Sequence, residues 1–215
     1  TLFGMDVVLS ADNADDYYDR IADYLGTEAF RPRALFDQFN IEVIATTESP
    51  LDPLASHQAL AQSDWNGRVI TTYRPDAIIN PHASGINDGG FATAIEELGA
   101  ITGLATTSWD GYLDAHRDRR AFFRSFGATA SDHGHPSAFT TVLDRAEAAA
   151  LFDKALQGRI SEHDAELFRG HMLVEMARMS CDDGMVMQLH AGSHRNHAQQ
   201  IFDDYGTDKG FDIPM

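Results

Sequence analysis

The chain has 215 residues, a length that predicts one large domain or two small ones. Its 33 acidic residues outnumber its 16 basic ones, and the formal charge of -17 argues against binding to nucleic acid phosphates or to an anionic membrane surface. The one cysteine, Cys181, excludes an intramolecular disulfide and lies in a helical pattern, where we expect a buried and inert thiol. Because no apolar run reaches the length of a membrane span, we expect a cytoplasmic protein.

The first half of the chain alternates predicted helices with predicted strands. Apolar residues at helical spacing predict the first two helices, and proline at the first helical position supports a third, which Asp52 would cap. A loop rich in Asn, Pro, Gly and His follows the second strand and runs to Gly90. The predicted elements are helices over 14–25 and 31–39, a strand over 41–46, a helix over 53–64 and a strand over 69–73.

The second half of the chain predicts further helices and two more strands. The longest helix has a cap signal at Ser161, followed by Asp164 in the position of a capping box, and Gly184 ends it. The predicted elements are helices over 91–101, 108–125, 144–156 and 161–182, and strands over 128–131 and 185–190. Strands that alternate with helices predict a parallel sheet in an α/β fold. Four strands are few for this length, so we expect a single domain over residues 1–215 that is part of a larger barrel.

Polar residues follow each of the four predicted strands. They lie at Thr46 to Glu48, Arg74 to Asp76, Asp132 to His135, and His190 to His197. The carboxyl ends of parallel strands meet at one edge of a sheet, where α/β enzymes place their active sites. This convergence predicts an enzyme.

Three of these residues have side chains suited to catalysis or substrate binding. Arg74 precedes a proline, which holds its backbone extended, and its guanidinium could bind a carboxylate; the alternative is a pair with Asp76. Asp132 could accept a proton or orient a hydroxyl, or it could cap a helix. His190 could bind a metal, donate to a substrate oxygen, or lie in the core.

Other histidines and glycines give weaker support for a functional site. His194 and His197 have the spacing of a metal-ligand pair, but no acidic or cysteine ligand is placed to complete a site. Five further histidines are expected to be structural or solvated: His57, His82, His116, His163 and His171. Gly85, Gly89 and Gly90 do not follow the spacing of a phosphate-binding loop, which argues against a nucleotide site.

In this order, the motifs make the chain resemble the uronate isomerase family of the amidohydrolase superfamily. The resemblance extends from about Arg31 onward and rests on residues 45–52 with His57, 73–76, 130–134, 187–192 with Arg195 and Asn196, and 205–212. It implies a distorted (β/α)8 TIM barrel with added helices. It also implies that the substrate is a hexuronate, with D-glucuronate converted to D-fructuronate and D-galacturonate to D-tagaturonate by proton transfer between C2 and C1.

The resemblance implies Arg74, Asp132, His190 and Arg195 as site residues. We expect Asp132 and His190 to be catalytic, and we expect the substrate-binding residues to be Arg74, Arg195, Asn196 and His133. The family also implies a homo-oligomer and a divalent metal, usually zinc, on a His-x-His pair near the N-terminus and an aspartate of the last barrel strand. His133 and His135 have the His-x-His spacing but match a different family segment, so we assign no metal ligand to this chain.

The chain is thus expected to be the central part of a longer enzyme. A partial barrel leaves strand edges uncovered, so we expect residues 1–215 alone to be unstable or oligomeric. Two alternatives remain: a hydrolase of the same superfamily, in which a metal-bound hydroxide attacks an ester or amide, and a non-catalytic fragment. Arginines suited to a carboxylate, without a nucleophile-activating pair, favour the isomerase.

Overall fold

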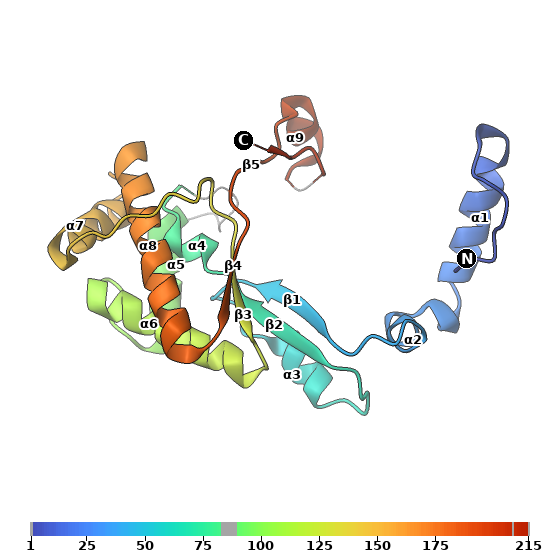
Figure 1. Cartoon of the computed structure of the whole chain (residues 1–215), viewed down its shortest axis with the longest axis horizontal. Helices are drawn as coiled ribbons and strands as arrows, with labels where there is room; N and C mark the ends of the chain where they lie inside the picture. Colours follow the sequence, from blue (N-terminus) through green and yellow to red (C-terminus); the bar gives the residue numbers. More distant parts are fainter. Residues whose placement is uncertain (1, 83–89, 208, 215) are drawn as a thin grey trace. The chain divides into compact units, whose positions relative to one another are not determined.

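The computed structural model describes residues 2–82, 90–207 and 209–214, so Gly85 and Gly89 of the predicted loop lie outside the described residues. The chain divides into two compact units (Figure 1). The first unit comprises Thr1–Ile44 and Ser63–Val69, and the second comprises Ala45–Gln62 and Ile70–Met215. The expected single domain over residues 1–215 stays a prediction.

The first unit contains two short α-helices, α1 (Ala14–Leu25) and α2 (Pro32–Gln38), which agree closely with the predicted helices. Short 3-10 helices, η1 (Ala11–Asn13) and η2 (Glu28–Phe30), precede each of them. Aromatic contacts hold this unit together: Phe3 stacks on Phe30 with ring centroids 5.1 Å apart, and Phe36 meets Trp65 edge-on at 4.9 Å.

The central sheet has four strands in the order β1 (Ile44–Glu48), β2 (Val69–Tyr73), β3 (Ala130–His133) and β4 (Val186–Leu189). Strands β2, β3 and β4 pair in parallel, with Tyr73 opposite Ser131 and Ser131 opposite Met187, which confirms the predicted parallel sheet. β1 is the hydrogen-bonded neighbour of β2, and Arg74 N donates to Glu48 O at 3.0 Å.

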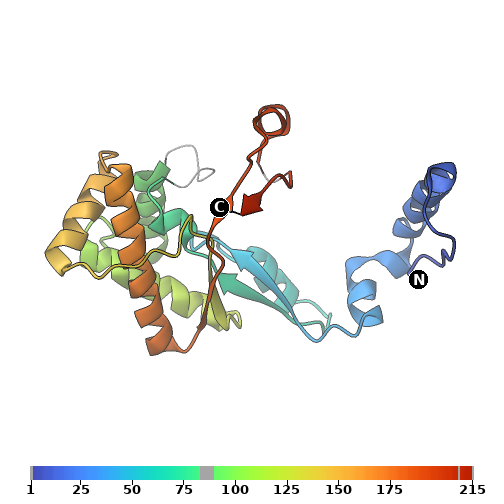
Figure 2. The same ribbon diagram turned by 45° about the horizontal axis from the view of Figure 1, so that its top comes forward.

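Seven helices are described in the second unit. A small antiparallel pair, β5 (Ser193–His194) and β6 (Ile213–Pro214), flanks the last of them in the sequence. The helices are α3 (Ala55–Ala61), α4 (Asp76–Ile79), α5 (Gly90–Thr102), α6 (Trp109–Ser125), α7 (Arg145–Leu156), α8 (Glu162–Asp183) and α9 (Gln199–Tyr205). Helices α5 to α8 lie together beside the sheet (Figure 2). The predicted cap of α8 is confirmed, because Ser161 Oγ accepts from Asp164 N at 3.1 Å, and Gly184 ends the helix with φ 77°.

The core of this unit lies between the sheet and helices α5 to α8. Tyr112 of α6 stacks on Phe152 of α7 with centroids 4.5 Å apart. Tyr73 of β2 is fully buried, packs edge-on against Phe123 at 5.2 Å and shares a 2.7 Å hydrogen bond with His116 Nδ1. These contacts fix one face of the sheet against α6, so the opposite face is left to carry the polar side chains.

Three expectations about local structure are wrong. β1 starts at Ile44 rather than at 41, and helix α3 runs over Ala55–Ala61 rather than over 53–64. The Asp52 carboxylate does not cap that helix; it accepts from Leu54 N at 2.6 Å, and buried Leu54 takes a left-handed conformation with φ 55°. The turn therefore places the helix start two residues later than the proline signal indicates.

Two other differences bear on function. β3 covers Ala130–His133 rather than 128–131, so Asp132 and His133 lie within the strand and point to opposite faces. Cys181 is exposed, because it falls on the side of α8 opposite buried Met179. Among the described residues, no helix is both long enough and apolar enough to cross a membrane.

Candidate active site

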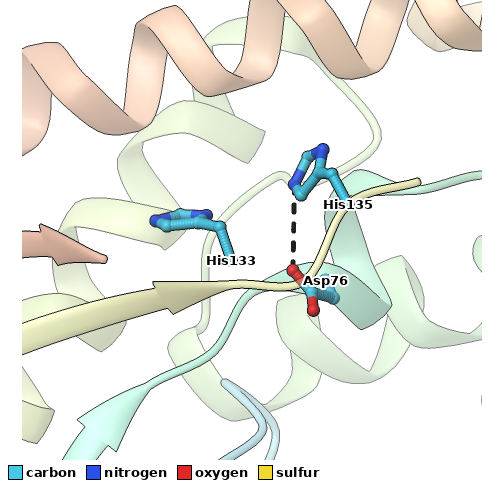
Figure 3. Close-up of side chains that lie close together, drawn as sticks. All are labelled: Asp76, His133 and His135. Carbon is cyan, nitrogen blue, oxygen red and sulfur yellow. Dashed lines mark ion pairs between the residues drawn. The ribbon is translucent and has the colours of Figure 1, made fainter. Parts of the chain in front are cut away.

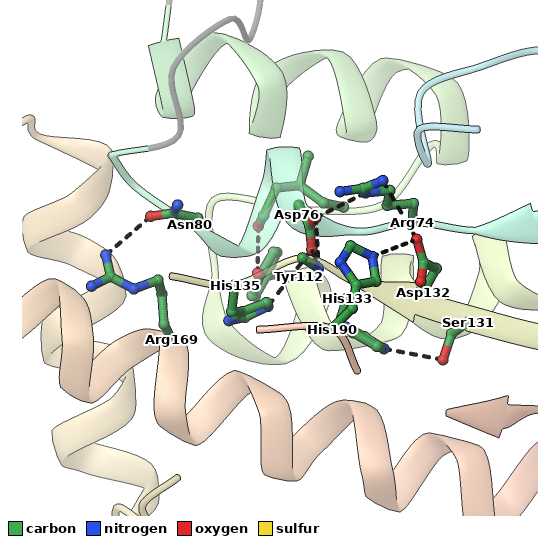
Figure 4. Close-up of polar contacts among 12 residues, drawn as sticks. Arg74, Asp76, Asn80, Tyr112, Ser131, Asp132, His133, His135, Arg169 and His190 are labelled. Carbon is green, nitrogen blue, oxygen red and sulfur yellow. Dashed lines mark hydrogen bonds and ion pairs between the residues drawn. The ribbon is translucent and has the colours of Figure 1, made fainter. Parts of the chain in front are cut away.

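Three neighbouring strands bring Arg74, Asp132 and His190 together, as the sequence predicted (Figure 4). Arg74 follows β2, Asp132 lies in β3 and His190 follows β4. Asp132 Oδ2 lies 3.1 Å from His190 Nε2 and 3.4 Å from Arg74 Nη1. The Asp132 side chain is 14% exposed, and those of Arg74 and His190 are 33% and 47% exposed. The carboxylate is thus held between a cation and an imidazole that solvent can reach.

Asp76 fixes the other side of Arg74. Its Oδ2 accepts from Arg74 Nε at 2.9 Å, and its two carboxylate oxygens accept from Gly134 N at 3.0 and 3.2 Å. The pairing of Arg74 with Asp76 that the sequence left open is therefore present. A guanidinium has five N–H groups, and these two carboxylates occupy two of them, so donors remain for a bound anion.

Gly134 keeps this cluster closely packed. A Cβ added there would collide with Arg74 Nη2 and would come within 3.0 Å of Asp76 Oδ2 and His190 Cε1. A side chain at this position has no space unless the arginine moves. The glycine thus lets the backbone of the loop after β3 approach the guanidinium.

An open pocket of about 490 Å³ lies against this cluster. Its wall combines the end of β1, the start of α4, the loop after β3 and β5. The residues that line it include Glu48, Arg74, Asp76, Gly134 and Arg195. The pocket is of a size that holds a small polar molecule, and two of its lining side chains are arginines.

The end of β1 is held in place by contacts from two helices. His57 of α3 is buried, and its Nε2 lies 2.9 Å from Thr46 Oγ1 and 3.8 Å from Glu48 Oε1. Arg119 of α6 donates to Pro50 O at 2.7 Å and to Asp52 O at 2.8 Å. These residues position the pocket wall rather than line it, which agrees with the structural role expected for His57.

The other two predicted binding residues that follow β4 differ in their placement. Arg195 lines the pocket and pairs with Asp212 at 3.1 Å, with both side chains partly exposed. Asn196 takes a left-handed conformation with φ 53°, and its backbone N–H donates to Asp212 Oδ1 at 2.9 Å. Asp212 therefore holds this turn through the Arg195 side chain and the Asn196 backbone.

His133 ends β3, His135 lies in the loop that follows it, and both side chains are buried. His133 is fully buried, with Nε2 3.1 Å from Ser131 Oγ, and His135 is 3% exposed, with Nε2 3.7 Å from Asp76 Oδ1. Burial lowers the pKa of the His133 imidazole to about 4, and burial also lowers the pKa of His135. The His133 ring is therefore neutral near pH 7. Ligand atoms of Asp76, His133 and His135 all lie within 4.8 Å of one another, a group that could hold a metal ion.

Sequence reasoning did not assign roles to Asp76 and Gly134. The available signal was their position, since each follows a predicted strand beside a candidate residue. What joins them is a hydrogen bond between residues 58 positions apart, which no local pattern encodes.

Comparisons with known proteins give a consistent result. The family model described as glucuronate isomerase matches residues 1–214. Curated uronate isomerases from Xanthomonas axonopodis pv. citri (strain 306) and Mesorhizobium japonicum are 56% and 55% identical, over 100% and 99% of this chain. In both cases the match covers 44% of the relative, so the chain spans less than half the length of these proteins.

Two solved structures show the same fold. The crystal structure of glucuronate isomerase from Caulobacter crescentus matches with a TM-score of 0.91 and 52% identity, over 100% of this chain and 44% of that one. The uronate isomerase from Thermotoga maritima matches with a TM-score of 0.87 and 26% identity, over 99% of this chain and 46% of that one. The predicted α/β fold, part of a TIM-type barrel, is confirmed, and the chain belongs to the glucuronate isomerase family.

Proposed function

We propose that the protein containing this chain isomerises hexuronates between aldose and ketose forms. D-glucuronate would become D-fructuronate, and D-galacturonate would become D-tagaturonate. The observation that carries this proposal is the Asp132 carboxylate, held between His190 at 3.1 Å and Arg74 at 3.4 Å beside an open pocket. Names of relatives that share the whole of this chain support it, whereas none of those described above names a hydrolase.

The isomerisation requires a proton to leave C2 and another to reach C1. In the proposed reaction, the Asp132 carboxylate takes the C2 proton as the C2–H bond breaks, and His190 donates a proton to O1, so that an enediol forms. His190 then accepts the O2 proton as the C2 carbonyl forms, while Asp132 returns its proton to C1. The 3.1 Å contact between the two side chains lets one orient the other for these transfers.

The two arginines would hold the anionic sugar. Arg74 still has N–H groups free of the two carboxylates, and Arg195 lines the same pocket. Charge-assisted hydrogen bonds of this kind are about twice as strong as neutral ones. Asn196 and His133 stay predicted substrate-binding residues; His133 is fully buried within β3, so direct contact with substrate would require the residues packed over it to move.

The complete enzyme is proposed to be a cytoplasmic homo-oligomer of the amidohydrolase superfamily that carries a divalent metal, zinc. When bound, such a metal would polarise a sugar oxygen. The family's His-x-His pair and last-strand aspartate match no segment of this chain, so none of the steps above uses the metal. The single cysteine is compatible with the reducing compartment.

Isotope exchange tests the proposal directly. The complete protein is incubated with D-glucuronate in D2O, with and without added zinc, and NMR follows deuterium at C2 together with ketose formation. Exchange and ketose are expected from the complete protein, and a lower rate from residues 1–215 alone. Absence of both exchange and ketose in the complete, folded protein would overturn the isomerase assignment.

A further inference from the structure

We propose that Asp76, His133 and His135 form a binding site for a divalent transition metal ion of the zinc type. One carboxylate oxygen and two imidazole nitrogens lie within 4.8 Å of one another, and Figure 3 shows the three side chains side by side. Nitrogen and oxygen donors in this combination are preferred by Zn²⁺ and its neighbours in the first transition series. The inference concerns metal binding alone and does not rest on the isomerase activity.

Buried imidazole nitrogens of this cluster lack partners among the described residues. His133 Nδ1 and both ring nitrogens of His135 have no hydrogen-bond partner among the described residues. The two side chains are 0% and 3% exposed, so bulk water does not reach them. A buried polar group without a partner destabilises the fold, and this cluster contains three such nitrogens among the described residues. A metal ion would satisfy one nitrogen of each ring.

Hydrogen bonds already orient the His133 ring and the Asp76 carboxylate. His133 Nε2 lies 3.1 Å from Ser131 Oγ, an arrangement that leaves the Nδ1 lone pair for another partner. Asp76 accepts from Gly134 N and from Arg74 Nε, which fixes its carboxylate plane. Metal-binding histidines and carboxylates are typically held by such outer hydrogen bonds.

The distance between the ligand atoms and the access from the pocket also suit a metal ion. Zinc lies about 2.0–2.2 Å from nitrogen and oxygen ligands, which places tetrahedral ligands about 3.3 Å apart. His135 Nε2 and Asp76 Oδ1 are 3.7 Å apart, so this pair needs to close by only a few tenths of an ångström. Asp76 also lines the open pocket, which would give a metal ion a path to the cluster.

A proton is the competing explanation for the contact between His135 and Asp76. If His135 were protonated, its Nε2–H would pair with the carboxylate without any metal. That arrangement leaves His133 Nδ1 and His135 Nδ1 without partners among the described residues, whereas a metal uses a nitrogen of both rings. The unsatisfied nitrogens therefore favour the metal.

Metal stoichiometry separates these explanations. The protein is stripped with a chelator and titrated with Co²⁺, whose visible spectrum reports coordination, and with Zn²⁺ by calorimetry. His135→Gln and His133→Gln are expected to lose one bound equivalent. The matched control is the double variant His194→Gln/His197→Gln, which removes the other close histidine pair, with ring centroids 6.4 Å apart, and is expected to keep that equivalent.

A second measurement needs no variant. In the ¹⁵N-labelled wild-type protein, Zn²⁺ is expected to shift the ring nitrogens of His133 and His135, and the shifts follow the titration of that equivalent. Equal stoichiometry in the wild type and in folded His135→Gln would overturn the proposal. So would unchanged ring-nitrogen signals at saturating Zn²⁺, because the proton explanation predicts no response to metal.

Discussion

Asp132 and His190 come from adjacent parallel strands, and their side chains meet at 3.1 Å. The register explains the meeting: Asp132 pairs with Gln188 and His133 with Leu189, so His190 follows directly beyond the paired region. His190 N also donates to His133 O at 3.0 Å, which continues the ladder by one bond. The imidazole is therefore placed by the sheet itself and not by a free loop.

Replacing Asp132 tests its proposed role as base. Asp132→Asn keeps the size of the side chain but removes the charge that accepts the proton. In the complete enzyme we expect kcat to fall by roughly 100-fold or more, the usual contribution of a general base. Deuterium exchange at C2 measures the step. Asp114→Asn, an exposed carboxylate paired with Arg117, should leave it unchanged, and near-normal exchange in Asp132→Asn would remove Asp132 from the proton transfer.

Arg74→Lys tests substrate binding. Lysine keeps the charge but cannot bridge Asp76 and Asp132 while it donates to a substrate carboxylate. We expect kcat/KM for D-glucuronate to fall by roughly 10- to 100-fold, which corresponds to the loss of one charged hydrogen bond. Steady-state kinetics provide the measurement. Arg145→Lys, an exposed arginine paired with Asp110, is the control, and unchanged KM and kcat in Arg74→Lys would exclude Arg74 from the site.

Gly134→Ala tests the close approach of the loop to Arg74. The added methyl group would collide with Arg74 and crowd His190, so both stability and activity should fall, stability by about 1–3 kcal/mol. Gly158→Ala is the matched control: its Cβ would meet nothing within 4 Å, but its φ of 64° disfavours alanine. That variant should lose about 1 kcal/mol of stability and no activity. Equal activities in the two variants would contradict the steric argument.

The pH dependence of stability should reflect buried His116. Burial lowers its pKa from 6.5 to about 3, so the folded protein keeps this ring neutral while the unfolded chain takes up a proton. The free energy of unfolding therefore falls as the pH falls from about 6.5 to about 3, by about 1.4 kcal/mol per pH unit for this group. Urea unfolding at pH 7 and pH 5 measures the slope.

His116→Asn isolates that contribution. Asparagine can keep an acceptor for the Tyr73 hydroxyl but takes up no proton. Between pH 7 and pH 5, the free energy of unfolding should change less with pH than in the wild type. The difference is the contribution of the proton that His116 takes up in the unfolded chain. His163→Asn, which replaces an exposed histidine of α8, should not reduce the pH dependence in this way. Identical slopes in the wild type and His116→Asn would contradict a neutral buried ring.

The sequence predicted the features that depend on local signals. Ser161 and Gly184 cap the two ends of α8, which confirms both predicted ends of this helix. Strand ends rich in polar residues predicted that Arg74, Asp132 and His190 would meet, and the structure places them together. Their chemical roles stay predictions.

The features that were missed depend on contacts between distant residues. Leu54 adopts a left-handed conformation that costs energy for a residue other than glycine, and its complete burial offsets that cost. The sequence predicts Asp76 in the loop after a strand, and only the fold brings Gly134 N to its carboxylate. No propensity encodes such pairs, so neither the start of α3 nor the cluster around Asp76 could be read from the chain.

The two hydrogen bonds from Arg119 to the turn after β1 affect how the pocket wall becomes ordered during folding. The carbonyl oxygens of Pro50 and Asp52 lie 69 and 67 residues before the arginine that binds them. The entropy of closing a loop of that length has to be offset before the contact forms, so the turn depends on the prior docking of α6. Amide hydrogens of this turn should therefore exchange together with those of α6, although the two segments are remote in sequence.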